Sequence, residues 1–264
     1  MLNHNFKKKF GQNFLSDKNL LTAIIQDANV GKDDDVLEIG AGGGSLTEIL
    51  SQYARSVVSY EIDTDLKDHL FSLGLKNTTF RFADIMKCDI QDIESDFKGG
   101  YRVVANLPYY ITTPIIFKFL TQSTKVKSLT IMVQKEVAER IVSACGSKDY
   151  GVLSVMVGFY GQAKISRYVS RKMFYPQPNV DSAVVHIEVE NKHPDIDRDK
   201  FYSFIQSCFS MRRKILRNNL THALKIKGDT LDSLFSLETL AKRAESFSLD
   251  DFIDVFNKIK DYID

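Results

Sequence analysis

The run Asn106-Leu107-Pro108-Tyr109 carries groups suited to chemistry on an adenine ring. The exocyclic amine of adenine is a poor nucleophile because its lone pair is delocalised into the ring. The side-chain carbonyl of Asn106 and the backbone carbonyls of Leu107 and Pro108 can accept hydrogen bonds from that amine and draw its nitrogen toward a tetrahedral shape. The Tyr109 ring offers a flat surface for a base that has left its stack. The run therefore predicts modification of adenine without a strong general base.

A glycine cluster, Gly40-Ala41-Gly42-Gly43-Gly44, precedes this run in the chain and follows the apolar stretch 35–39. Glycine lets the backbone turn tightly and approach a ligand where any Cβ would collide. The spacing departs from the dinucleotide pattern G-x-G-x-x-G because Ser45 stands at the sixth position. The pattern G-x-G-x-G, which begins at Gly40 and includes Gly42, favours a nucleoside bound without a pyrophosphate.

Two acidic residues stand at the ends of the next two predicted strands. Glu61 follows the stretch 56–60, about 20 residues after the glycine cluster, where a carboxylate can bind both ribose hydroxyls. Asp84 follows the stretch 78–83 and can accept a hydrogen bond from an adenine amine. Either residue alone would also suit a solvated strand end. Together with the glycines they predict a cofactor crevice, because the carboxyl ends of parallel strands meet at one edge of a sheet.

The elements that position these residues alternate between short β-branched runs and helical stretches from about residue 18 to 190. Strands separated by helices need crossover connections, which produce a mainly parallel sheet covered on both faces. Two later runs are joined by a proline-bearing loop and predict an antiparallel edge pair. The expected fold class is α/β, Rossmann-like, with a seven-stranded sheet. Its strands are predicted at 35–39, 56–60, 78–83, 101–105, 128–134, 163–170 and 182–189.

A polar segment that contains proline, 191–195, marks the predicted domain boundary. We expect residues 1–190 to form the α/β domain and residues 191–264 to form a small all-helical domain. Helices are predicted there at 201–209, 214–224 and 249–259.

The bulk composition is that of a globular protein, since 44% of the 264 residues are hydrophobic and 26% are charged. No apolar run approaches the roughly 18 residues that a membrane span needs, and no apolar stretch follows the charged N-terminus. The three cysteines are far apart and lack metal-ligand spacing. The sequence therefore predicts no membrane span, no secretory signal, no disulfide framework and no metal site, in keeping with a cytoplasmic protein.

The net charge is only +1, but the basic residues are clustered. Local basic clusters can bind nucleic-acid phosphates even when the whole chain is nearly neutral, although charge runs are also common on solvated faces. One such cluster comprises Arg167, Arg171 and Lys172. We predict RNA phosphate contacts for the other basic residues, Lys7, Lys8, Lys9, Arg212, Arg213, Lys214 and Arg217.

These motifs resemble those of the KsgA-type ribosomal RNA adenine dimethyltransferases, and the resemblance extends nearly from end to end. The opening block 10–15 is similar to the segment that covers the cofactor in that family. The resemblance implies that Asn13 and Leu15 contact S-adenosylmethionine. The other residues that match the family's cofactor positions are Gly40, Glu61, Asp84 and Asn106.

Two further blocks carry the resemblance into the second half of the chain. Residues 174–182 match the pattern F-x-P-x-P-x-V-D-S, and residues 209–214 resemble the basic segment that opens the family's helical domain. The first match implies that Phe174 lies on the opposite side of the target base from Tyr109. The family's activity implies transfer of methyl groups to two adjacent adenosines in a hairpin loop near the 3′ end of 16S rRNA. The implied partner is the small ribosomal subunit during its biogenesis, and we expect a monomer.

Other functions fit parts of the sequence. A resistance-type methyltransferase that acts on an adenine of large-subunit rRNA shares the glycine loop and a similar turn, but the blocks 180–182 and 212–214 favour the small subunit. A DNA adenine methyltransferase usually has proline where Leu107 stands. A small-molecule methyltransferase would not need the basic clusters or the helical domain. A non-catalytic ribosome-assembly factor would be expected to lose Asn106, Tyr109 or the glycines.

Overall fold

The computed structural model of this chain describes residues 14–190 and 192–263. Two compact units are present. The first comprises the described residues up to Ala138 together with Ala163–Glu190, and the second comprises Glu139–Gln162 and the residues from 192 onward. The sequence-based boundary at 190 coincides with one of these divisions. The segment Glu139–Gln162, which we expected in the α/β domain, groups with the second unit instead.

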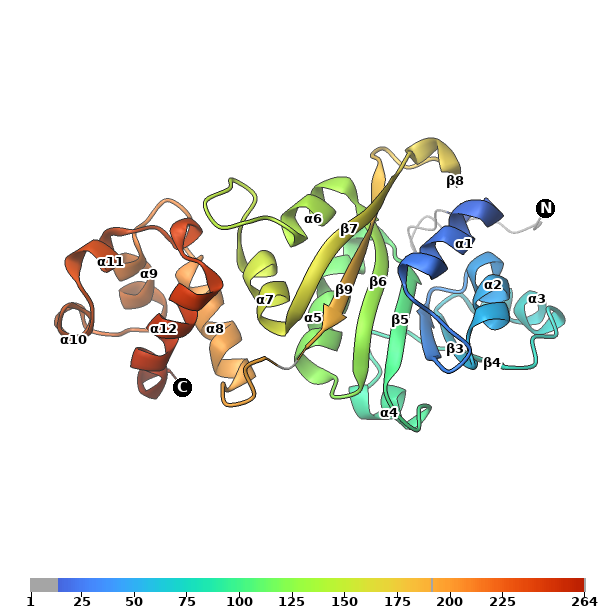
Figure 1. The fold of residues 1–264 in the computed structure, drawn as a ribbon, viewed down its shortest axis with the longest axis horizontal. Helices are drawn as coiled ribbons and strands as arrows, with labels where there is room; N and C mark the ends of the chain where they lie inside the picture. Colours follow the sequence, from blue (N-terminus) through green and yellow to red (C-terminus); the bar gives the residue numbers. More distant parts are fainter. Residues whose placement is uncertain (1–13, 191, 264) are drawn as a thin grey trace. The chain divides into compact units, whose positions relative to one another are not determined.

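A seven-stranded sheet forms the centre of the first unit, in the order β4-β3-β2-β5-β6-β9-β7 (Figure 1). The strands β4, β3, β2, β5 and β6 pair in parallel, and β9 runs antiparallel to β6. This order confirms the predicted Rossmann-like α/β class with β7 and β9 at one edge. The bounds are β2 (Asp35–Ile39), β3 (Ser56–Glu61), β4 (Thr78–Phe82), β5 (Tyr101–Asn106), β6 (Val126–Gln134), β7 (Gly161–Val169) and β9 (Ser182–Val189).

The central strands are apolar runs because helices cover both faces of a parallel sheet. All five residues of β2 are buried, and so are most residues of β5 and β6. In the first unit these strands alternate with helices that pack their apolar faces onto the sheet. Those helices are α1 (Lys18–Asp27), α2 (Ser45–Tyr53), α3 (Lys67–Ser72), α4 (Ile90–Ser95), α5 (Thr112–Gln122) and the start of α6 (Lys135–Ile141).

A second, two-stranded sheet joins β1 (Phe14–Leu15) to β8 (Phe174–Tyr175). The strands are antiparallel, and Leu15 is paired with Phe174. Both side chains are buried in one apolar cluster with residues of α1 and α2. This pairing fixes the end of the opening block beside the F-x-P-x-P block, although more than half of the chain separates them in sequence.

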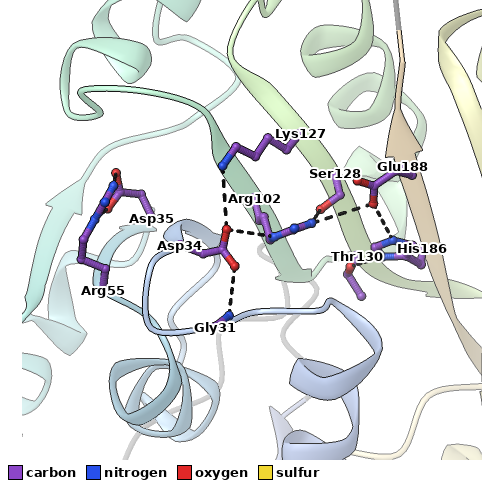
Figure 2. A network of polar contacts seen from close by, with 10 residues as sticks. All are labelled: Gly31, Asp34, Asp35, Arg55, Arg102, Lys127, Ser128, Thr130, His186 and Glu188. Atoms are coloured by element: carbon purple, nitrogen blue, oxygen red, sulfur yellow. Dashed lines mark hydrogen bonds and ion pairs between the residues drawn. The ribbon is translucent and has the colours of Figure 1, made fainter.

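A polar network ties β2, β5, β6 and β9 together at the edge of the sheet where the parallel strands begin (Figure 2). The Arg102 guanidinium lies 3.3 Å from Asp34 Oδ1 and 3.8 Å from Glu188 Oε2, and it donates to Ser128 Oγ at 2.9 Å. Glu188 in turn contacts the buried His186 ring at 3.1 Å. Burial lowers the pKa of His186, so this ring is uncharged at neutral pH. The network secures the edge opposite the strand ends that carry the predicted site.

The second unit is helical and has an aromatic core. Phe201, Phe204, Phe252 and Phe256 are fully buried, and the Phe159 ring of α7 stacks on Phe201 of α8 at 4.4 Å. This packing explains why 139–162 groups with the second unit. Its helices are α7 (Val152–Tyr160), α8 (Arg198–Cys208), α9 (Leu216–Ala223), α10 (Gly228–Leu234), α11 (Leu237–Ala241) and α12 (Leu249–Ile259).

The three cysteines are free thiols. Within 14–190 and 192–263, no helix is long and apolar enough to cross a membrane. Over the same residues, no group of three or more histidine, cysteine, aspartate and glutamate side chains is arranged to hold a metal ion.

Candidate active site

A cavity of about 340 Å³ lies at the carboxyl ends of the parallel strands in the first unit. Its wall includes the strand-end residues Ile39, Glu61, Asp84 and Asn106. The structure therefore brings together side chains that the sequence distributed over four βα connections. The predicted site residues that line this cavity are Leu15, Gly40, Gly42, Glu61, Asp84, Asn106, Leu107, Pro108, Tyr109 and Phe174.

The glycine cluster forms the turn between β2 and α2. Gly40, Gly42 and Gly44 have φ angles of 83°, 53° and 83°, a region that strongly favours glycine. The Gly40 amide donates to the Tyr60 carbonyl at 2.8 Å, which anchors the turn to β3. A Cβ on Gly40 would lie 3.8 Å from the Asn106 carbonyl oxygen, so the turn passes close to the end of β5. Backbone strain, rather than lack of space, is the main reason for glycine at this position.

The Glu61 carboxylate is held by backbone amides at the wall of the cavity. Its Oε2 accepts from the Gly42 amide at 2.7 Å, and its Oε1 accepts from the Asp63 amide at 2.8 Å. The residue is only 5% exposed, and burial raises the pKa of the carboxyl while the two amides oppose that shift. A buried carboxylate beside a glycine turn can accept hydrogen bonds from ligand hydroxyls.

Glu38, beneath the glycine turn, is a buried carboxyl to which the sequence analysis gave no role. Its Oε2 accepts from Thr47 Oγ1 and from Ser59 Oγ, each at 2.6 Å. The residue is fully buried, and burial raises its pKa to about 7. The signal for it in the sequence was an acidic residue between two apolar residues, Leu37 and Ile39.

Asp84 follows β4 and lies on the same wall of the cavity. Its Oδ1 accepts from the Met86 amide at 3.0 Å, which orients the carboxylate, and its Oδ2 is 3.9 Å from Lys87 Nζ. The side chain is 31% exposed. Ile85 and Met86 add apolar surface next to it, an arrangement that suits the edge and the face of a purine.

The turn after β5 presents Asn106 and Pro108 to the cavity. Pro108 has φ −56° and ψ 134°, and its carbonyl accepts from the Ile111 amide at 3.2 Å. One lone pair of that carbonyl is thus already used. The Pro108 carbonyl is therefore a weaker acceptor for an amine than the sequence alone suggested.

Two aromatic rings contribute to the cavity wall. The half-buried Tyr109 directs its hydroxyl to Ser182 Oγ at 2.9 Å, and burial raises the pKa of its phenol. Phe174 is 5% exposed and packs in the cluster that contains Leu15. Both rings face the same cavity, which is the condition for holding one base between them.

The basic residues differ in how much of their charge is already paired. Arg217 makes two hydrogen bonds of 2.8 Å to the Asp232 carboxylate, so its charge is largely compensated. Arg212, 70% exposed, lies 3.5 Å from Glu245, and Arg213 and Lys214 are exposed in the turn before α9. All four belong to the second unit. The other predicted contacts, Lys7, Lys8, Lys9 and Asn13, lie outside the described residues.

The basic turn is fixed by Asn219, a buried residue that the sequence analysis missed. Its side chain donates to the Cys208 carbonyl at 2.7 Å and accepts from the Met211 amide at 3.0 Å. Asn219 therefore joins α9 to the end of α8 and sets the path of the chain through Arg212 and Arg213. A polar residue on the buried side of an amphipathic helix is the pattern that would have indicated such a role.

Comparison with known proteins agrees with this site. The family model described as ribosomal RNA adenine dimethylase matches residues 3–261. A protein named ribosomal RNA small subunit methyltransferase A from Oceanobacillus iheyensis is 42% identical, covering 97% of this chain and 91% of that protein. A protein of the same name from Clostridioides difficile is 39% identical, covering 97% and 92%.

Solved structures agree in fold. The crystal structure of a dimethyladenosine transferase from Plasmodium falciparum superposes with a TM-score of 0.82 at 26% identity, covering 94% of this chain and 98% of that chain. The 23S rRNA methyltransferase ErmE has the same fold, with a TM-score of 0.70 at 24% identity, covering 94% and 100%. The match over almost the whole chain, on a fold whose cavity gathers the predicted residues, shows that this chain belongs to the ribosomal RNA adenine dimethylase family.

Proposed function

We propose that this chain transfers methyl groups from S-adenosylmethionine to the exocyclic amines of two adjacent adenosines in a hairpin loop near the 3′ end of 16S rRNA. The observation that carries the proposal is that the Asn106–Tyr109 turn and the glycine–carboxylate edge line one cavity. Family membership supports adenine in ribosomal RNA as the target. The names of the curated relatives support the small subunit.

The residues of the cavity fit S-adenosylmethionine. The turn at Gly40 and Gly42 lets backbone approach the ligand, and the buried Glu61 carboxylate suits the two ribose hydroxyls. Asp84 suits the adenine amine of the cofactor, and Leu15 contributes apolar surface. Asn13, from the same opening block as Leu15, would be a further contact to the cofactor. When bound, the cofactor supplies an electrophilic methyl group on a sulfonium centre.

The target adenine would be held between Tyr109 and Phe174. The Asn106 side chain and the Leu107 carbonyl accept hydrogen bonds from its amine and concentrate the lone pair on nitrogen. As the amine nitrogen takes the methyl group, the carbon–sulfur bond of the sulfonium would break and leave a neutral thioether. The nitrogen would carry the positive charge, which these acceptors would stabilise. The proton then leaves to water without a strong base, so positioning supplies most of the rate gain. A second transfer requires the same pocket to accept the monomethylated amine.

The basic residues would bind rRNA phosphates within the small ribosomal subunit, so that binding weakens steeply as salt increases. Arg212, Arg213 and Lys214 are exposed and suit this role, as would Lys7, Lys8 and Lys9. Arg217 would contribute less because Asp232 already pairs with it. We propose that the enzyme acts as a monomer in the cytoplasm, where small subunits are assembled.

Two alternative functions fit the site less well than this proposal. A resistance-type enzyme acting on large-subunit rRNA would use the same fold, but relatives about 40% identical over nearly the whole chain carry the small-subunit name. A non-catalytic assembly factor would not need an adenine-binding turn, whereas Asn106 and Tyr109 line one cavity together with Gly40 and Gly42.

The test uses the purified full chain and labelled S-adenosylmethionine. Unmethylated small subunits, large-subunit rRNA and duplex DNA are offered separately, and modified nucleosides are identified by mass spectrometry. Dimethyladenosine formed only in small subunits is the expected result. Label in large-subunit rRNA would assign the chain to the resistance type, and cofactor binding without transfer to any substrate would indicate an assembly factor.

A further inference from the structure

The segment that leads from β7 through the turn Arg171–Met173 into β8 is traced in Figure 1. It carries two tyrosines and two cations, and a third cation, Lys135, lies against one of the tyrosines. Tyr168 is 60% exposed and Tyr175 is 70% exposed. One exposed tyrosine is ordinary on a protein surface. Two exposed tyrosines close in sequence to several cations are typical of a surface that binds nucleic acid. The residues of this aromatic–basic surface are Lys135, Tyr168, Arg171, Lys172 and Tyr175.

Lys135 and Tyr168 are in direct contact. The Lys135 ammonium lies 5.4 Å from the centre of the Tyr168 ring, within the range of a cation–π interaction. Lys135 follows β6 and Tyr168 is near the end of β7. At exposed sites such a contact is weak, so the ammonium can move onto a phosphate when a base stacks on the ring.

Asp181 connects this surface to the ring proposed to stack on the target adenine. Its backbone carbonyl accepts from the Lys135 amide at 3.0 Å, and its carboxylate accepts from the Arg171 amide at 2.9 Å. The next residue, Ser182, contacts the Tyr109 hydroxyl at 2.9 Å. The basic residues are therefore positioned by the same short segment that positions Tyr109.

The strand β8 gives a second connection. Its two residues alternate, as neighbours on a strand do, so that Phe174 is buried and lines the cavity while Tyr175 is exposed. Arg171 and Lys172 stand three and two residues before Phe174 and are also exposed. A polynucleotide that leaves the cavity past Phe174 would thus meet cations and exposed aromatic rings at once.

We propose that the aromatic–basic surface binds the single-stranded nucleotides that flank the flipped adenine, with Tyr168 stacking on one base and the cations contacting the adjacent phosphates. The inference rests on the proposed function, because it needs an RNA strand at the cavity. It adds a positioning surface to the α/β unit itself, separate from the basic turn of the helical unit.

Charge and side-chain chemistry favour RNA as the occupant. The stretch 168–181 carries Arg171 and Lys172 against one carboxylate, Asp181, which already accepts from the Arg171 amide. Arg167, which belongs to the same basic cluster in sequence, does not take part because it forms hydrogen bonds of 2.5 and 2.8 Å with Asp27. Stacking tolerates any base sequence, which suits the positioning of a strand rather than its selection.

The variants Tyr168→Ala, Tyr168→Leu and Tyr168→Phe test the stacking role, and the double variant Lys135→Gln/Arg171→Gln tests the phosphate contacts. Lys164→Gln is the matched control, because Lys164 is an exposed cation on the same strand four residues earlier. For each full-length variant we would measure kcat and KM with unmethylated small subunits, the Kd for S-adenosylmethionine, and subunit binding as a function of salt.

Tyr168→Ala and Tyr168→Leu should raise KM for small subunits about 5- to 20-fold, the loss of one stacked base, with kcat and cofactor affinity unchanged. Tyr168→Phe should restore KM, and the double variant should reduce the salt slope of log K by about 2. Two results would overturn the inference, provided that the wild-type enzyme is active. One is a KM for small subunits that stays within about twofold of the wild type in Tyr168→Ala and Tyr168→Leu. The other is a KM for Tyr168→Phe that is as high as that of Tyr168→Ala. If the wild type transfers no methyl groups, the proposed function fails. Binding of small subunits by the same variants then still shows whether the aromatic–basic surface binds RNA.

Discussion

The hydroxyl oxygens of Tyr109 and Ser182 lie 2.9 Å apart, although 73 residues separate them in sequence. The contact joins the turn after β5 to the first residue of β9, and thus joins two blocks that the sequence presented as independent motifs. Burial raises the pKa of Tyr109, so its hydroxyl stays protonated and can donate to Ser182. The ring proposed to stack on the target base is therefore held at its polar end.

Tyr109→Ala should cost about 1–3 kcal/mol in kcat/KM because it removes the stacking surface. Tyr109→Phe keeps the ring and loses only the hydrogen bond, so it should cost about 0.5–1.5 kcal/mol. Ser182→Ala should have the same small effect as Tyr109→Phe. The measurement is methyl transfer to small subunits by the two single variants and their combination. Additive losses in this double-mutant cycle would show that the contact does not position the ring.

Asn106→Ala should lower kcat by at least about 10²-fold, since a group that stabilises charge in the transition state typically contributes that much. Binding of small subunits and the melting temperature should stay close to those of the wild type, because Asn106 stands at a strand end and is partly exposed. The measurement is single-turnover transfer of labelled methyl groups. Near-normal turnover would remove Asn106 from the mechanism.

Glu61→Gln should weaken cofactor binding about 10- to 100-fold, because ribose hydroxyls would lose a charged acceptor at a buried position. Burial raises the pKa of Glu61, so this carboxyl takes up a proton at a higher pH than an ordinary glutamate does. As the pH is lowered, the wild-type Kd for S-adenosylmethionine should therefore begin to rise at that higher pH. The variant should lack this component of the pH dependence. Calorimetric titration with S-adenosylmethionine measures both effects. Glu48→Gln, at a partly exposed position on α2, is the control, and a loss of the same size there would contradict the assignment.

The parallel strands and the cavity edge were predictable because both depend on local pattern. Strands buried on both faces read as continuous apolar runs, and β2 begins and ends at the residues predicted, 35 and 39. The glycine turn and the carboxylates then follow from the rule that parallel strands share one carboxyl edge.

Long-range partners were not predictable from the same patterns. The pairing of Leu15 with Phe174 depends on a register that no local run encodes. The helix α7 is buried on nearly all sides, so its sequence does not indicate which unit it packs against. In the same way, the pairing of Arg217 with Asp232 is a tertiary contact, invisible to an argument from charge clusters.

The pH dependence of stability should report on Glu38. Burial raises the pKa of this carboxyl from the usual 4.5 to about 7 in the folded chain. Between about pH 4.5 and 7 the folded chain therefore holds a proton that the unfolded chain has released. The free energy of unfolding should fall by about 3 kcal/mol as pH rises through this window, and then level off.

Glu38→Gln isolates that contribution, since a glutamine carbonyl can still accept from Thr47 and Ser59 but carries no ionisable group. Urea denaturation of the variant between pH 5 and pH 8 should show a decline smaller than that of the wild type by about the same 3 kcal/mol. The surface variant Glu238→Gln, whose side chain is 83% exposed, should keep the wild-type decline. Parallel curves for the wild type and Glu38→Gln would mean that Glu38 is ionised in the folded chain across this range, and that buried hydroxyls alone stabilise its charge.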